Sequence, residues 1–516
     1  MNITKISRRS VFRNLAAIAA SNTLLQILGF VYRIFLSRMT GAEGLGIYQL
    51  VMPFYSVLSS LTLTGFTVAV ARISAERCAL SDFHGARRAV SLSRLCFIVA
   101  VIILAFPVLA NRHAVARGIL GDIRTVHALP FVFVCLFFTG LENILKNYFY
   151  GVGRVAPQIT SELSEQIIRA IAVAALLLAF RPGDPGFSAM LIVIGMVISE
   201  IFSSFMLTAF YRPERKLLSA KKLRAPSIRE VLSIAVPVSA AATVNNILGS
   251  VNSILIPQRL RVSGLSAKAA TEVFGVMFGM TMPLLSFPIA FIASLTSVMV
   301  PKISEQLASG SEAEMRRKAG KTIHSTSLLA MPCIAVLIPL GEPLCRLLFS
   351  HESAGAFMLP LCIATMLSYY ELCACALLNG IGMQRHAAIY IVVGGAIQLA
   401  FTWSVGIPHI GMWGFVLGYI ISSGVTAFLT FRCLVKRLKL RPRWGNWFLT
   451  PLIASVLCSL ICDIVYNMLL LRISSEGVCI IISALVGFCA YSLSLAALGT
   501  SITRYLKTLI PKQTDA

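Results

Sequence analysis

The chain has 516 residues, of which 57% are hydrophobic and 13% are charged. Soluble domains carry about 25% charged residues, so this composition excludes an ordinary soluble domain. A formal net charge of +24 could suggest nucleic-acid binding, but the basic residues lie in short segments between apolar runs. A membrane therefore explains the charge better, and we expect no nucleic-acid partner.

Apolar runs of about 20 residues recur along the whole chain, and each can cross a hydrocarbon core of about 30 Å. They predict an all-α polytopic membrane protein with about fourteen transmembrane helices. In chain order, the expected spans cover residues 14–37, 47–71, 89–110, 127–150, 159–180, 187–210, 230–257, 272–299, 323–342, 355–380, 387–407, 411–431, 448–471 and 477–500.

Basic residues are distributed unevenly between the two sides of these spans. The segments YRPERKLLSAKKLR (211–224), RRKAGK (316–321) and RCLVKRLKLRPR (432–443) all fall on the side of the N-terminus. Because Lys and Arg accumulate in cytoplasmic loops, we expect a multi-pass protein of the cytoplasmic membrane with both termini in the cytoplasm.

Three short sequences recur in the same order after 220–230 residues: LLQILG (24–29) with VNNILG (244–249), ARISAE (71–76) with PKISEQ (301–306), and LENILKNYFYGVG (141–153) with YELCACALLNGIG (370–382). This repeat predicts two parallel, pseudo-symmetric lobes of six helices each, followed by two additional helices. The expected domains are an N-terminal lobe (1–210), a basic cytoplasmic linker (211–229), a C-terminal lobe (230–431), and the last two spans with a cytoplasmic tail (432–516).

The segment ILGFVYRIFLSRMTGAEGLGIYQ (27–49), together with ARISAE and NYFYGVGR (147–154), resembles the stage V sporulation protein B group of polysaccharide-export proteins. That group belongs to the multidrug/oligosaccharidyl-lipid/polysaccharide exporter superfamily and is related to the lipid II flippases. The resemblance covers the whole chain. It implies a transporter that flips a polyprenyl-diphosphate-linked saccharide, such as a peptidoglycan precursor, across the cytoplasmic membrane by alternating access.

The related flippases bind the diphosphate with cavity arginines, but this sequence departs from their pattern. The arginine that they carry just before the LGF motif is Gln26 here, and Arg33 lies in the same helix instead. A second arginine expected in the second span has no counterpart. The cationic site of those relatives therefore cannot be transferred to this chain.

Polar side chains in the first and seventh expected spans are candidate substrate contacts. Arg33 either binds phosphate through its two-pronged guanidinium or extends toward the outer headgroups. Gln26 and Asn246 occupy equivalent repeat positions, and Asn245 and Asn252 lie in the same seventh span as Asn246. These amides either bind sugar hydroxyls or hold neighbouring helices together.

Arg72 and Lys302 also occupy equivalent repeat positions, at the expected cytoplasmic ends of the second and eighth spans. They either form an entry site for the anionic diphosphate or simply follow the cytoplasmic bias of basic residues.

Opposite charges lie one helical turn apart inside two expected spans. Glu142 precedes Lys146 in the fourth span, and Glu165 precedes Arg169 in the fifth. Such pairs either neutralise each other as structural ion pairs or couple transport to a proton or sodium ion. Glu371 repeats Glu142 in the second lobe, but a cysteine follows it one turn later. Either each of the two glutamates holds the Gly-x-Gly loop beneath it (151–153 and 380–382) through inter-helix hydrogen bonds, or Glu371 titrates during transport.

The thirteen cysteines form no CxxC motif and no Cys/His cluster, so we expect no metal site and no cofactor. The sequence contains no nucleotide-binding loop or catalytic triad, which argues against an enzyme. An ion gradient or the membrane potential would then drive transport, with membrane lipids and the lipid-linked saccharide as partners. Two alternatives stay open: a cation-coupled multidrug exporter on the same fold, and a non-transporting scaffold for cell-wall synthesis.

Overall fold

A computed structural model describes residues 8–214, 226–350 and 357–499. In these ranges every regular element is helical and no strand occurs, which confirms the predicted all-α class. Contacts divide the chain into unit 1, Met1–Gly279 with Gly406–His409, and unit 2, Met280–Val405 with Ile410–Ala516. This boundary differs from the predicted linker at 211–229, because the helix of the seventh expected span packs within unit 1.

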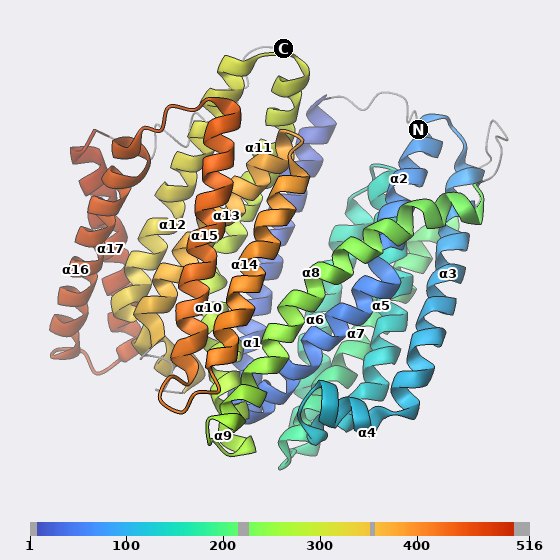
Figure 1. Ribbon diagram of the computed structural model, residues 1–516, viewed down its shortest axis with the longest axis horizontal. Helices are drawn as coiled ribbons and strands as arrows, with labels where there is room; N and C mark the ends of the chain where they lie inside the picture. The colour runs from blue at the N-terminus through green and yellow to red at the C-terminus, as the bar shows by residue number, and fades with distance from the viewer. Residues whose placement is uncertain (1–7, 215–225, 351–356, 500–516) are drawn as a thin grey trace. The chain divides into compact units, whose positions relative to one another are not determined.

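Unit 1 contains helices α1 to α9 (Figure 1). These are α1 (Arg8–Ser59), α2 (Gly65–Ala79), α3 (Phe83–Ala110), α4 (Arg112–Ala114), α5 (Leu129–Gly151), α6 (Ala156–Phe180), α7 (Pro185–Glu214), α8 (Ile228–Val262) and α9 (Ala267–Phe274). Unit 2 contains α10 (Met282–Ser286), α11 (Ile289–Ala308), α12 (Glu312–Phe349), α13 (Met358–Gly380), α14 (Gln384–Ser404), α15 (Met412–Leu438), α16 (Thr450–Leu470) and α17 (Glu476–Ala497). Shorter π or 3₁₀ turns lie at Ser60–Thr64, Val115–Ile119, Ile123–His127, Gly275–Thr281 and Gly445–Leu449.

Thirteen helical segments of the described chain are long and apolar enough to cross a membrane. The first of them, Ala20–Ala79, covers most of the first expected span (14–37) and all of the second (47–71). The chain leaves helical geometry inside it at Gly41, where φ is 67° and ψ is 179°. Only glycine adopts this backbone conformation readily, so the break lies where the sequence predicts a connection between two spans.

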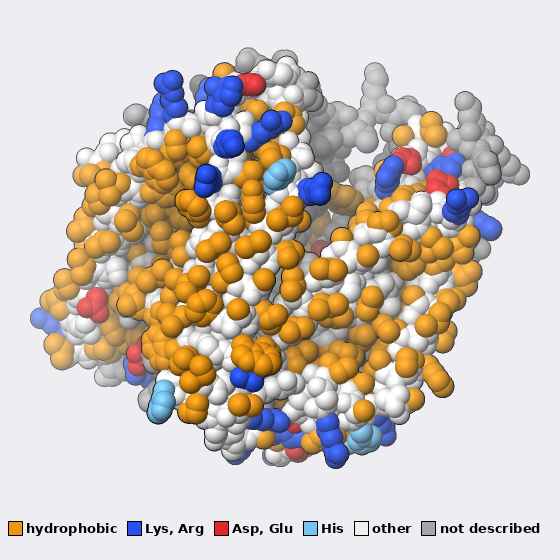
Figure 2. Space-filling view, viewed as in Figure 1, with side chains coloured by type: hydrophobic (Ala, Val, Ile, Leu, Met, Phe, Trp, Pro, Cys, Tyr) orange, Lys and Arg blue, Asp and Glu red, His pale blue; other side chains and the backbone are white. Residues whose placement is uncertain are grey.

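Lipid-facing character is visible in the exposed side chains. Phe106 on α3 is 77% exposed and Leu493 on α17 is 71% exposed, whereas a soluble monomer rarely exposes extended apolar surface. On the face shown in Figure 2, hydrophobic side chains cover the middle of the helices, and Lys and Arg gather toward their ends. The chain is therefore a multi-pass membrane protein.

The connection between α4 and α5, outside the spanning helices, is held by ion pairs. Arg124 Nη2 lies 2.7 Å from Asp122 Oδ2, Arg124 Nη1 lies 2.5 Å from Glu43 Oε1, and Arg261 Nη2 lies 3.5 Å from Asp122 Oδ2. Burial disfavours the charged form of Asp122, but hydrogen bonds from Arg124 outweigh it and hold the pKa of this carboxyl below its usual value.

Candidate functional site

Charged side chains from three adjacent helices meet inside unit 1. Glu142 and Lys146 come from α5, Glu165 and Arg169 from α6, and Glu200 from α7. We call these five residues the charge cluster. Their side chains range from 1% exposed for Glu142 to 19% exposed for Arg169, so the cluster lies within the helix packing and not on a solvated surface.

Ion pairs connect the whole charge cluster. Lys146 Nζ lies 2.5 Å from Glu142 Oε1 and 3.1 Å from Glu165 Oε2. Arg169 pairs with Glu165, and its Nη2 lies 3.2 Å from Glu200 Oε1. The two pairs predicted separately from the sequence are thus parts of one network that joins α5, α6 and α7.

The cluster contains one more carboxylate than cation. Three glutamates face one lysine and one arginine, and one carboxylate oxygen of each glutamate lies within 4.8 Å of those of the other two. The second oxygen of Glu142, Oε2, is buried and has no hydrogen-bond partner in the described part of the chain. Because buried charges must be compensated, a proton or an oxygen-preferring cation would balance this arrangement.

Serine hydroxyls hold Glu142 against the neighbouring helices. Ser161 on α6 donates to Glu142 Oε1 at 3.2 Å, and Ser203 on α7 donates to the same oxygen at 2.5 Å. On the other side of the cluster, Arg169 Nε donates to Ser199 Oγ at 3.4 Å. The cluster is therefore held by hydrogen bonds to uncharged serine hydroxyls as well as by ion pairs.

Small residues on α7 allow α6 to approach closely enough for these contacts. Gly195, Ser199 and Ser203 follow each other at intervals of four residues and so lie on one face of the helix. A Cβ atom added at Gly195 would overlap the side chain of Val173 on α6 and lie 3.1 Å from its backbone. Such small residues commonly mark close helix contacts in membranes.

Glu200 is the member of the charge cluster that the sequence analysis missed. It lies within the expected span 187–210 and has no oppositely charged residue one turn away on its own helix. Its partner, Arg169, is on α6. An acidic residue inside an apolar span is itself a sign of a functional or paired charge. Its partner could not be identified from the sequence, because helix packing determines which residue lies opposite.

Glu371 differs from its repeat counterpart. It is partly buried on α13 of unit 2, and no hydrogen bond or ion pair of its carboxylate occurs within the described ranges. The helix contacts nearby use hydroxyls instead, with Ser368 Oγ 2.9 Å from Ser423 Oγ. Glu142 thus makes inter-helix hydrogen bonds, but to serines of α6 and α7 and not to the loop 151–153. Titration of Glu371 stays a prediction.

Two candidate substrate contacts, Arg72 and Asn252, bind residues of their own helices. Arg72, in the middle of α2, forms an exposed pair with Glu76 at 2.9 Å, one turn later in the same helix. Asn252 Nδ2 donates to the backbone oxygen of Leu248 at 3.3 Å within α8. Both contacts join residues of the same helix, and they leave a substrate role as a prediction.

The other candidates are spread over α1 and α8. Gln26 is exposed on α1, Arg33 is half-buried further along the same helix, and Asn246 is half-buried on α8. The side chains of Asn245 and Lys302 lie outside the described residues.

Residues 11–307 match the model of a family described as "Polysaccharide biosynthesis protein". The chain belongs to this family. A second model, "Lipid II flippase MurJ", matches residues 280–487. This membership confirms the resemblance drawn from the first-span motif.

Relatives of this polysaccharide biosynthesis family member include two proteins of Bacillus subtilis (strain 168). The chain is 22% identical to stage V sporulation protein B over 432 residues, covering 82% of this chain and 83% of the relative. It is 21% identical to the lipid II flippase MurJ over 405 residues, covering 72% of this chain and 73% of the relative.

Solved structures of transporters share the fold. An inward-facing multidrug resistance MATE transporter of the MOP superfamily gives a TM-score of 0.65 at 16% identity, covering 80% of this chain and 95% of that one. The lipid II flippase MurJ in an inward closed conformation gives a TM-score of 0.64 at 13% identity, covering 93% and 98%.

Proposed function

We propose that this family member flips a polyprenyl-diphosphate-linked saccharide, a peptidoglycan precursor or a related cell-wall intermediate, across the cytoplasmic membrane. The observation that carries the proposal is the pair of family matches, polysaccharide biosynthesis over 11–307 and lipid II flippase over 280–487, on an all-helical membrane fold. A transporter and not an enzyme is proposed because the similar proteins include a lipid II flippase and a multidrug resistance transporter. Both termini are proposed to be cytoplasmic, from the distribution of basic residues.

The charge cluster is proposed to couple flipping to a proton or sodium gradient. Its excess carboxylate and the unpartnered Oε2 of Glu142 offer a place for one positive charge. Because the five side chains link α5, α6 and α7, neutralising that charge changes the balance of forces between these helices and so favours one state of an alternating-access cycle. One charge that crosses a potential of 100 mV supplies about 2.3 kcal/mol.

Depletion in cells tests the substrate class. We expect depletion of the protein to raise the amount of a polyprenyl-diphosphate saccharide on the inner leaflet, measured by extraction and by accessibility to an added cytoplasmic-side enzyme. Complementation with the wild-type chain should restore the original distribution. Unchanged precursor pools in depleted cells would contradict the proposal.

The multidrug exporter is the second candidate, because the MATE transporter shares the fold at a TM-score of 0.65. The same depleted cells distinguish it. Raised sensitivity to cationic drugs with unchanged precursors would favour drug export, whereas neither effect together with a division or envelope defect would favour a non-transporting scaffold.

A further inference from the structure

Unit 2 contains a strongly basic pocket with a volume of about 560 Å³. None of its lining residues is acidic. Six of them are lysines or arginines: Arg316, Arg317, Lys321, Lys439, Arg441 and Arg443. We call this site the basic pocket. None of the five charge-cluster residues lines it, and it does not include Glu371.

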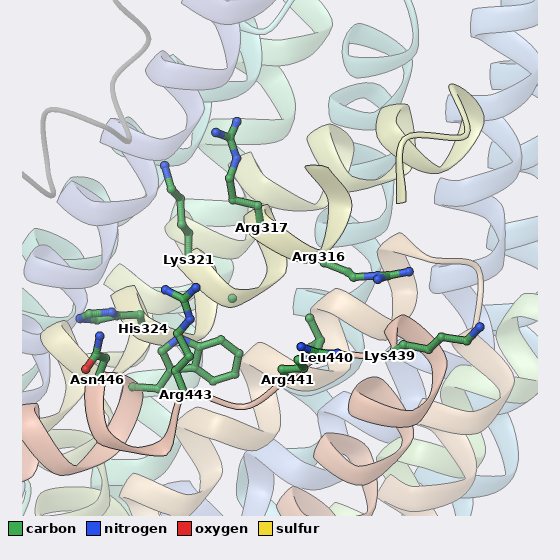
Figure 3. Close-up of a pocket in the computed structure, with 11 residues that line it drawn as sticks. Arg316, Arg317, Lys321, His324, Lys439, Leu440, Arg441, Arg443 and Asn446 are labelled. Carbon is green, nitrogen blue, oxygen red and sulfur yellow. The ribbon is translucent and has the colours of Figure 1, made fainter. Parts of the chain in front are cut away.

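Two segments that are far apart in the sequence form its walls. The first turns of α12 carry Arg316, Arg317 and Lys321, and the connection from α15 to the turn Gly445–Leu449 carries the other three cations. Figure 3 shows Arg443 extending toward α12, with Lys439 and Arg441 on the same connecting segment. The sequence analysis identified both segments only as separate basic loops.

Backbone geometry brings the second wall into place. Lys439 adopts a left-handed conformation with φ of 48°, which ends α15, and the amide of Leu440 donates to the carbonyl of Val435 at 3.1 Å. At the floor, the buried ring of Trp447 lies against Gly320 on α12, where an added Cβ would be 2.8 Å from Trp447 Cζ2. The close contact holds the two walls together.

The two walls differ in charge compensation. On α12, Arg316 pairs with Glu312 at 2.5 Å and Arg317 with Glu314 at 3.5 Å. On the connecting segment, exposed Lys439, Arg441 and Arg443 have no ion-pair partner among the described residues. Clustered like charges repel each other, and a bound anion would relieve this repulsion.

A second basic pocket of about 550 Å³ adjoins the first through Lys439, which lines both. Its other basic residues include Arg432, Lys436 and Arg437, and it too has no acidic lining residue. The excess of positive charge thus continues along the end of α15, which favours a ligand with more than one anionic group.

Aromatic side chains beside the pocket indicate its position relative to the membrane. Trp444 is 60% exposed and lies with its ring centroid 5.8 Å from that of Phe431 and 5.4 Å from that of Phe448. Tryptophan is enriched at the membrane–water interface, and the spanning segment Gly445–Leu470 starts one residue later. The pocket is therefore expected at the level of the lipid headgroups, on the side predicted to be cytoplasmic.

We propose that the basic pocket binds the phosphate headgroup of an anionic lipid in the cytoplasmic leaflet. Arginine forks bind phosphate oxygens in pairs, basic pockets beside spanning helices recognise anionic headgroups, and a volume of about 560 Å³ accommodates a headgroup with its acyl or prenyl chain outside. Two lipids share this chemistry: an anionic phospholipid and a polyprenyl diphosphate. The site binds such a lipid whether or not the chain flips it.

Binding to the purified full chain in neutral detergent tests the proposal. Three probes are titrated separately: phosphatidylglycerol, a polyprenyl diphosphate and inorganic pyrophosphate, with bound ligand counted by native mass spectrometry. We expect one or both lipids to bind to the wild-type chain. The Arg441→Gln/Arg443→Gln double variant should bind them at least about tenfold more weakly, because it loses charged hydrogen bonds to phosphate. Tighter binding of the diphosphate would identify the lipid-linked substrate as its ligand, and preference for phosphatidylglycerol would identify a bulk lipid.

Matched variants separate the pocket from general charge. Arg385→Gln/Arg472→Gln removes two exposed cations that line neither pocket, and it should bind both lipids as the wild type does. Arg441→Lys/Arg443→Lys keeps the charge but loses the fork, so it should bind with intermediate affinity. Equal weakening in the control variant, no weakening in the pocket variant, or pyrophosphate binding as tight as lipid binding would overturn the proposal. Loss of lipid binding with normal flipping would leave the proposed transport function standing.

Discussion

Replacing Lys146 by methionine removes the cation that lies between Glu142 and Glu165. Its ammonium is 2.5 Å from one carboxylate oxygen and 3.1 Å from the other, and its side chain is 9% exposed. At an effective dielectric constant of about 20, each contact has a gross Coulomb energy of about 5–7 kcal/mol. Part of this lost Coulomb energy is offset in the methionine variant, because no ammonium has to be dehydrated and buried. The net loss of stability should then be about 3–5 kcal/mol, typical of a broken buried pair.

A double-mutant cycle with Glu142→Gln isolates the interaction. The single Lys146→Met variant leaves three carboxylates against one arginine, whereas the double variant leaves two against one and restores the original charge difference. We expect the double variant to be more stable than the sum of the single effects, by about 0.5–3 kcal/mol. Equilibrium unfolding in mixed micelles measures all four free energies. A loss below about 1 kcal/mol for Lys146→Met, or strict additivity, would refute a buried ion-pair network.

Three further changes test the charge cluster, its helix packing and the ion pairs of Asp122. Glu200→Gln removes the excess negative charge, so transport should lose its dependence on a proton or sodium gradient while the purified protein keeps its fold; retained dependence would exclude Glu200 from coupling. Gly195→Ala should cost about 1–3 kcal/mol of unfolding free energy through overpacking against α6, whereas Gly249→Ala, with open space around it, should not. Asp122→Asn should destabilise the protein at neutral pH. The pKa of Asp122 is lower in the folded protein than its value near 3.8 in the unfolded chain, so the ionised carboxylate stabilises the fold at pH values above 3.8. The difference from wild type should shrink as pH falls through and below that value, and a difference independent of pH would argue against the Arg124 interaction.

Hydropathy predicted the helices well because each span must be apolar to enter the membrane, whatever its neighbours are. The break between the first two spans followed from the same pattern, and Gly41 supplies the backbone conformation for it. The unit boundary at Gly279 was not predictable in this way, because it depends on which helices pack together and not on their composition.

Side-chain chemistry was predicted only where both partners lie on one helix. Glu165 and Arg169 are one turn apart and form the expected pair, but the contact between Arg169 and Glu200 joins two helices. The internal repeat gave Glu142 and Glu371 the same expected role, yet only Glu142 has hydroxyl donors from neighbouring helices in the described structure. A repeat preserves backbone position more closely than it preserves the chemistry around a side chain.

Transbilayer movement of a lipid-linked saccharide in proteoliposomes tests the central claim most directly. Purified wild-type chain is reconstituted with a labelled polyprenyl-diphosphate saccharide, and its appearance in the opposite leaflet is followed with and without an imposed proton or sodium gradient. We predict protein-dependent movement of the lipid that is faster under one of the two gradients. In the Glu200→Gln variant, the rate under that gradient should fall to the rate measured without a gradient. No movement of the lipid under any gradient, with gradient-driven uptake of a cationic dye by the same vesicles, would contradict it.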